Sequence, residues 1–117
     1  MWTEQYLKFT LKESDIGFLI LTKKMKINYI NRILISELGY SREELVRKRV
    51  ERFLKDPNKF RRNLLTNIGS SNKKPIRCKF IRKDDSMVKL RFNVKIRVNN
   101  KNLLRGYYFF QNNFKSL

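Results

Sequence analysis

The chain has 117 residues, of which 41% are hydrophobic, and it carries a formal net charge of +18. This length suits one domain with a real core, and the hydrophobic fraction argues against disorder. The longest apolar run, residues 16–21, is too short to cross a bilayer, so we expect no membrane span and no signal peptide. A single cysteine, Cys78, excludes an internal disulfide and suits a reducing cytoplasm.

The basic residues are concentrated in the second half of the chain. Residues 57–117 contain 16 Lys and Arg against two Asp, whereas residues 1–56 contain 12 basic and eight acidic residues. Such a charge attracts acidic proteins, nucleic acids or anionic membrane surfaces. Charge alone bears on solubility and non-specific binding, so a composition rich in Lys, Ile and Asn, or an acidic counterpart elsewhere, is the preferred explanation.

An amphipathic helix is predicted over residues 1–13. Trp2, Tyr6 and Phe9 share one stripe of this helix. Because an amphipathic helix needs an apolar surface to cover, we expect the stripe to pack on the chain's own sheet or on a second copy of the chain.

The next segment is predicted to be a β-hairpin followed by short helices. Residues 18–22 (FLILT) and the alternating segment that ends at Ile30 form the two strands. Asn31 is a good N-cap for the following helix, which ends at Gly39. Ser41, with a Glu three residues later, then starts a further helix with a capping box.

A longer helix and three strands complete the predicted elements. Asp56 followed by Pro57 is a clear helix start signal. From Lys74 the period changes to alternation, and six alternating apolar residues over 88–98 predict an antiparallel strand with one face in the core. The last strand, residues 103–111, is apolar on both faces, so we predict a central place for it in the sheet.

Four stretches, taken in this order, resemble the PAS domain. They are residues 15–31 (its opening hairpin), 37–46 (its Gly-Tyr-Ser-x-Glu-Glu-Leu signature), 80–90 (its Arg-Lys-Asp-Gly-Ser hairpin) and 106–113 (its closing strand). The resemblance implies an α+β fold, with a PAS-like five-stranded antiparallel sheet that packs helices on one face. We expect the PAS domain over residues 14–114, preceded by an N-terminal amphipathic cap helix over residues 1–13.

The sequence departs from the PAS pattern at four positions. Thr22 and Asn112 stand where the family usually has Asp, and Met25 and Asp85 stand where it usually has Gly. In many PAS domains the Asp at the position of Asn112 is tied to signal transmission into the next module. This departure puts that transmission route in question here.

The residue types give little basis for catalysis or for the common PAS cofactors. The chain has no His, which rules out a His-activated nucleophile and His-ligated haem, and one Cys cannot form a zinc site. The resemblance places Glu51 where light-oxygen-voltage photosensors carry their reactive Cys. Cys78 alternates with Ile76 and Phe80, so it is predicted to be a core residue. We therefore expect no enzyme activity, cofactor or metal from this chain by itself.

Two sets of residues are candidate sites. A small apolar ligand would bind in an interior space lined by Ile20, Leu34, Leu38, Phe53, Phe60, Leu64, Phe92 and Tyr108. Close packing of these side chains against one another is the preferred interpretation. The outer sheet face is expected to expose Tyr107 and Phe109 beside six basic residues, Arg77, Lys79, Lys89, Arg91, Lys95 and Arg97.

A basic sheet face with exposed aromatic residues binds single-stranded nucleic acid in several protein classes. The preferred interpretation is that the N-terminal helix, from this copy or from a partner's, covers Tyr107 and Phe109, with Trp2, Tyr6 and Phe9 as the contact. The basic residues then form a solvated rim.

The resemblance implies a cytoplasmic sensory or protein-interaction domain of a signal-transduction protein, such as a sensor histidine kinase of a two-component system. It would act by ligand- or partner-dependent rearrangement of a homodimer. Its expected partners are a second copy of the chain and a downstream signalling module or an acidic protein. The alternatives are a basic regulator that binds nucleic acid through its outer sheet face and a stand-alone PAS protein that binds a small ligand.

Overall fold

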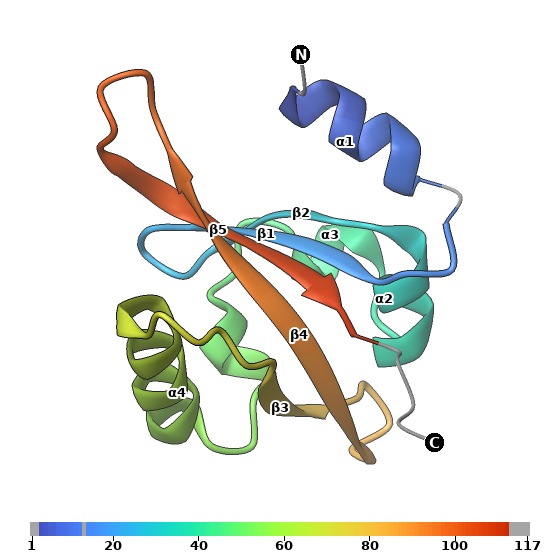
Figure 1. Ribbon diagram of the computed structural model, residues 1–117. Helices are drawn as coiled ribbons and strands as arrows, with labels where there is room; N and C mark the ends of the chain where they lie inside the picture. The colour runs from blue at the N-terminus through green and yellow to red at the C-terminus, as the bar shows by residue number, and fades with distance from the viewer. Residues whose placement is uncertain (1–2, 13, 113–117) are drawn as a thin grey trace, which may run out of the picture.

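The computed structural model describes residues 3–12 and 14–112, which form a five-stranded antiparallel sheet with helices (Figure 1). The strands are β1 (Phe18–Thr22), β2 (Ile27–Ile30), β3 (Ile76–Ile81), β4 (Met87–Val98) and β5 (Leu104–Gln111). They lie in the order β2-β1-β5-β4-β3, so the last strand is central, as its apolar sequence predicts. The long alternating segment is likewise confirmed as a single extended strand, β4.

Helices pack against both faces of the sheet. They are α1 (Glu4–Leu11), α2 (Arg32–Leu38), α3 (Arg42–Leu45), the 3₁₀ helix η1 (Val50–Phe53) and α4 (Pro57–Gly69). The four helices between β2 and β3 cover what we call the inner face, which carries Leu19, Phe92 and Phe109. α1 lies on the opposite, outer face, which carries Phe18 and Tyr108. The α+β, PAS-like arrangement predicted from the sequence is confirmed.

The helices begin where the sequence predicts. The Asn31 side chain accepts a hydrogen bond from the backbone N–H of Leu34, and α2 ends at Gly39 with a left-handed φ of 82°. Ser41 forms the predicted capping box at the start of α3. Asp56 accepts from the backbone of Lys59 at the start of α4. These signals succeed because each depends only on residues within one helical turn.

Asn31 also joins four segments of the chain. Its side chain is 1% exposed, and its Nδ2 donates to the carbonyl oxygens of Leu11 (3.0 Å) and Ile16 (2.8 Å). Its Oδ1 accepts from the backbone N–H groups of Phe18 (3.0 Å) and Leu34 (3.4 Å). A side-chain amide has two donor hydrogens and two acceptor positions, so this one is fully bonded. The amide thereby ties the end of α1, the following loop, β1 and α2 together.

Gly106 lets β1 and β5 approach each other closely. It pairs with Thr22 on β1 and with Arg97 on β4. A Cβ at this position would overlap the backbone carbonyl of Leu21. The central strand therefore requires a residue without a side chain at this point of the ladder.

Part of the apolar face of β4 extends past the core. Leu90, Phe92 and Val94 are buried, but Ile96 and Val98 are 49% and 43% exposed. In Figure 1 the β4–β5 hairpin lies apart from the helices, above α4 and to the left of α1. The alternating pattern predicts the strand correctly. It does not predict where burial of the apolar face ends, because the residues that bury this face belong to other elements of the fold.

Two of the departures from the PAS pattern retain the backbone that Gly would favour. Met25 and Asp85 have φ values of 67° and 69°. A left-handed conformation is unfavourable for a residue with a side chain, although less so for Asp than for Met. The turns are thus preserved although the glycines are not.

We expect Asn31→Ala to lower the free energy of unfolding by about 3 kcal/mol, because four buried hydrogen bonds are lost. The carbonyls of Leu11 and Ile16 keep only their longer bonds from Ser14. Asn31→Asp keeps the acceptor oxygens but loses both donors, so we expect a comparable loss at neutral pH. Urea denaturation measures both, with the exposed Asn28→Ala as control. A loss below about 1 kcal/mol in both variants would contradict the bonding described.

Gly106→Ala is expected to lower the free energy of unfolding by about 3 kcal/mol, because the added methyl group forces β1 and β5 apart. The matched control is Gly69→Ala at the end of α4, where an added Cβ meets nothing within 4 Å. We expect the control to be neutral or slightly stabilising. Equal denaturation midpoints for the two variants would show that the strands tolerate a side chain at Gly106.

Candidate functional site

α1 is attached to the outer face by one side only. Leu7 and Leu11, which are 8% and 9% exposed, pack with Phe18, Ile20 and Tyr108. Burial of a leucine side chain stabilises by roughly 1.5–3 kcal/mol. The apolar attachment of α1 therefore depends on two leucines.

Glu4, in the first turn of α1, adds a charged contact. Its carboxylate accepts hydrogen bonds from Arg97 Nε (2.5 Å) and Nη2 (3.1 Å) of β4 and from the Tyr108 hydroxyl (3.0 Å) of β5. Partial burial by itself would raise the pKa of Glu4, but the bonds from Arg97 and Tyr108 and the nearby positive charges lower it below its ordinary value. Sequence reasoning missed this residue, because a Glu at a helix start is explained by the helix dipole alone.

The opposite side of α1 faces solvent. Tyr6 is 61% exposed and Phe9 is 79% exposed. Trp2, the third member of the predicted stripe, lies outside the described residues. The prediction that this stripe packs on the chain's own sheet is therefore wrong for Tyr6 and Phe9, since Leu7 and Leu11 occupy that position.

The faces of β1 and β5 are the reverse of those predicted. Tyr107 and Phe109 lie in the inner cluster, 5% and 1% exposed, and not on the outer face. Ile20 and Tyr108, predicted to line the interior, lie in the outer cluster under α1. Both strands are buried on both faces, so their sequences contain no alternation that distinguishes one face from the other, and a shift of one residue exchanges the faces.

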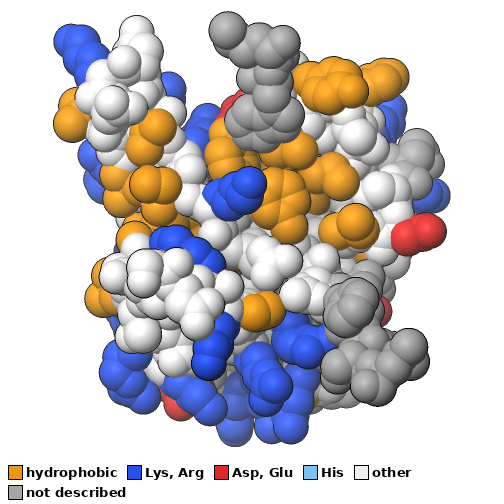
Figure 2. Space-filling model, viewed as in Figure 1, with side chains coloured by type: hydrophobic (Ala, Val, Ile, Leu, Met, Phe, Trp, Pro, Cys, Tyr) orange, Lys and Arg blue, Asp and Glu red, His pale blue; other side chains and the backbone are white. Residues whose placement is uncertain are grey.

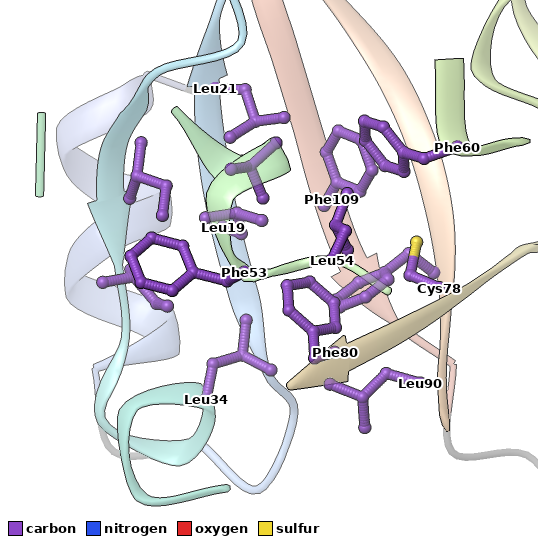
Figure 3. Close-up of a cluster of buried hydrophobic side chains, with 14 of the residues drawn as sticks. Leu19, Leu21, Leu34, Phe53, Leu54, Phe60, Cys78, Phe80, Leu90 and Phe109 are labelled. Atoms are coloured by element: carbon purple, nitrogen blue, oxygen red, sulfur yellow. The ribbon is translucent and has the colours of Figure 1, made fainter. Parts of the chain in front are cut away.

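The other six residues of the predicted ligand pocket meet on the inner face. Figure 3 labels three of them, Leu34, Phe53 and Phe60. Each of them is at most 5% exposed. Phe60 of α4 stacks on Phe109 with ring centres 6.0 Å apart, and Phe109 meets Phe92 edge-on at 5.6 Å. These rings, with Leu34, Leu38, Phe53 and Leu64, form a packed cluster between sheet and helices.

The two residues most relevant to covalent chemistry are held in unreactive states. Cys78 is 4% exposed, and burial raises the pKa of its thiol to about 12, so it stays protonated at neutral pH. Glu51 is bound by Arg49 at 2.8 Å and by Arg61 at 3.0 Å. Within residues 3–12 and 14–112, no group of three or more His, Cys, Asp or Glu is placed to hold a metal ion. None of the helices described has the length and apolar character needed to cross a membrane.

The predicted basic residues project from β3 and β4 but differ in their surroundings. Arg97 is bound by Glu4, as described above, and Lys95 is paired with Tyr108 in the sheet. The other four form two cross-strand pairs of like charge, because Arg77 lies opposite Arg91 and Lys79 opposite Lys89. The basic face thus divides into a part bound to α1 and a part beside the edge strand β3.

Comparison with known proteins finds similarity in structure and not in sequence. No protein-family model and no curated protein matches the chain. The PAS domain of a protein from Colwellia psychrerythraea matches with a TM-score of 0.81 and 11% identity, over 94% of this chain and 95% of that chain.

Two further solved structures have a TM-score of 0.73. A PAS domain from a two-component sensor histidine kinase is 12% identical over 92% of this chain and 93% of that one. A light-oxygen-voltage domain, described with a flavin analogue, is 17% identical over 92% of this chain and 84% of that one. The chain therefore has the fold of a PAS domain.

Proposed function

We propose that the chain is a sensory or protein-interaction module of a signal-transduction protein and that it acts through α1 and not through catalysis. The observation that supports this most is the one-sided attachment of α1. On its docked side the helix is held by two leucines, by the Glu4 carboxylate and by the hydrogen bond from Asn31 to the Leu11 carbonyl. Phe9 on its other side is 79% exposed. A helix attached in this way can change its contacts without unfolding of the sheet.

The setting we propose is a cytoplasmic sensor histidine kinase with a downstream output module. One structural neighbour is a PAS domain from such a kinase, which makes this setting a natural candidate. A single free cysteine, buried in the core, suits a reducing compartment. The interior cluster is packed with aromatic rings, so the proposal relies on the α1 surface and not on a bound apolar ligand.

The first partner we propose is a second copy of the chain, paired through the exposed side of α1. A two-fold dimer uses the same patch on both copies, and large exposed aromatic side chains are typical of such contacts. Tyr6 and Phe9 would supply the apolar centre of this contact.

In size-exclusion chromatography with light scattering at about 0.1 mM, we expect the native chain to have twice its monomer mass. The variant Tyr6→Glu with Phe9→Glu should have the monomer mass, because each introduced charge disrupts an apolar contact. Leu65→Glu is the matched control, since Leu65 is 69% exposed on α4. A monomeric native chain, or a double variant that remains dimeric, would refute pairing through α1.

Glu4→Gln tests the charged contact that holds α1. At neutral pH we expect the protection of α1 amides from hydrogen exchange to fall by about 1 kcal/mol, because Arg97 loses its ionic partner. The pKa of Glu4 is lowered in the folded chain, so its contribution is complete above the ordinary carboxyl pKa and is lost as the pH falls through the folded value. Lowering the pH should therefore reduce the protection of the α1 amides in the native chain, whereas in Glu4→Gln the protection should not change with pH for this reason. The same pH dependence of α1 protection in both proteins would contradict this role for Glu4.

A further inference from the structure

Two hollows adjoin the edge strand β3, and their linings share Lys59 and Arg77. The larger, about 770 Å³, is bounded by α4, the loop after it and the start of β3. The smaller, about 410 Å³, lies between the start of α4 and the middle of β3. We call this surface the β3 tract, and its cations are Lys55, Lys59, Lys74, Arg77, Lys79, Lys89 and Arg91.

The described residues that line the β3 tract include far more cations than carboxylates. Among residues 3–12 and 14–112, Asp56 is the only acidic residue that lines either hollow, and one of its carboxylate oxygens caps α4. Four other carboxylates, those of Glu4, Glu37, Glu44 and Glu51, are bound to cations outside the tract. Within the described chain, Arg77, Lys79 and Lys89 form no ion pair.

The sheet bears an energetic penalty for this arrangement. Arg77 is directly opposite Arg91, and Lys79 is directly opposite Lys89. Like charges directly opposite each other in an antiparallel pair are destabilising. Neighbouring pairs on the same face are about 6.8 Å apart along the strands. Selection for stability alone would separate these charges, so an anionic ligand with repeated charges is the natural reason to keep them together.

We propose that the β3 tract binds the phosphate backbone of a single-stranded nucleic acid. The guanidinium of Arg77 and the ammonium groups around it are the groups that bind phosphate oxygens. Two hollows that follow one another along one edge strand suit a flexible nucleic-acid strand that runs beside it. The site shares four basic residues with the nucleic-acid surface predicted from the sequence, but it lacks the predicted aromatic residues, because Tyr107 and Phe109 lie on the inner face.

The shape and surroundings of the tract disfavour a bilayer. A bilayer is flat, and proteins that bind its surface combine cations with exposed apolar side chains. Figure 2 shows Lys and Arg gathered over the lower part of the molecule, where α4, β3 and the start of β4 lie, and apolar side chains mostly higher up. Pro75 is the exposed apolar residue among those described in the lining, whereas Leu54, Phe60, Ile76 and Cys78 are at most 5% exposed.

The edge of β3 disfavours an acidic peptide. A peptide would gain most by pairing with the edge strand through main-chain hydrogen bonds. Lys55 N–H already donates to the Lys79 carbonyl, and Leu54 bridges to Phe80. The half of the edge nearest Lys79 is thus occupied, whereas a phosphate backbone needs only the side-chain cations.

Among the described residues that line the tract, none presents an exposed aromatic ring on which a base could stack, since Phe60 is 4% exposed. Contacts limited to phosphate carry no sequence information. We therefore expect oligonucleotides of equal length but different sequence to bind with equal affinity.

The test is fluorescence anisotropy of the full chain with labelled single-stranded RNA and DNA about 20 nucleotides long, over a range of salt concentrations. The tract variant combines Lys59→Ala, Arg77→Thr, Lys79→Thr and Lys89→Thr. We expect the tract variant to bind roughly a hundredfold more weakly at low salt. The slope of log affinity against log salt should fall by about 3, because each of the four phosphate contacts removed contributes ~0.7 to it.

The matched control removes the same charge from the β1–β2 and β4–β5 turns, by Lys23→Ala, Lys24→Ala, Lys26→Ala and Lys101→Ala. We expect it to lose less than about tenfold, because none of these four lysines lines either hollow. No oligonucleotide binding at low salt, or equal losses in the two variants, overturns the proposal.

Three further readouts complete the test. The tract variant should melt at the same temperature as the native chain or a few degrees higher, because two like-charge pairs are relieved. If the tract variant does not fold, the double variant Lys59→Ala with Lys79→Thr takes its place. The expected reduction in the slope of log affinity against log salt is then about 1.4. Oligo-glutamate of equal charge, phosphatidylserine vesicles and duplex DNA are the alternative ligands, and tighter binding of any of them than of the single strand overturns the assignment.

Discussion

The structure depends on a buried amide that four separate segments use at once. Asn31 bonds to the carbonyl that ends α1, to the loop after it, to the first residue of β1 and to the first turn of α2. The carbonyls of Leu11 and Ile16 also accept from the Ser14 hydroxyl, at 3.3 and 3.1 Å, and Asn31 gives each of them its shorter bond. The amide fixes where β1 begins and, through Leu11, where α1 ends. The position of α1 is thus coupled to the opening hairpin of the sheet.

A second constraint is the double burial of the central strand. β5 is covered on its inner face by α4, through Phe60, and on its outer face by α1, through Leu7 and Leu11. The inner cover consists of stacked aromatic rings, whereas the outer cover is a single helix with two buried residues. The two layers therefore differ in strength, which makes α1 the element most free to change its contacts. This difference explains why the function we propose is assigned to α1.

Local features of the fold could be predicted from the sequence, and long-range choices could not. The caps at Asn31, Ser41 and Asp56 and the alternation of β4 depend on neighbouring residues only, and they are correct. The side of α1 that docks is chosen by Glu4 and Arg97, which are 93 residues apart. Tyr107 and Tyr108 are both apolar enough for either face, so only the pairing of β5 with β1 decides between them.

The candidate sites illustrate the same limit. The excess of cations in the second half of the chain is visible in the sequence, but Lys55, Lys59 and Lys74 were not grouped with Arg77. They come from two loops, α4 and β3, and only the fold brings them to one edge. By contrast, the absence of His and the placement of Cys78 needed no structure to interpret, since they depend on residue type and on alternation within a single strand.

The most direct test of the account is hydrogen exchange of the side-chain amide of Asn31, measured by nuclear magnetic resonance of the native chain. Both of its hydrogens are bonded to buried carbonyl oxygens, so the account predicts that they exchange much more slowly than those of the exposed Asn28. Exchange of the Asn31 amide at the rate of Asn28 would contradict the account, because α1, the loop, β1 and α2 would then not be joined by this residue.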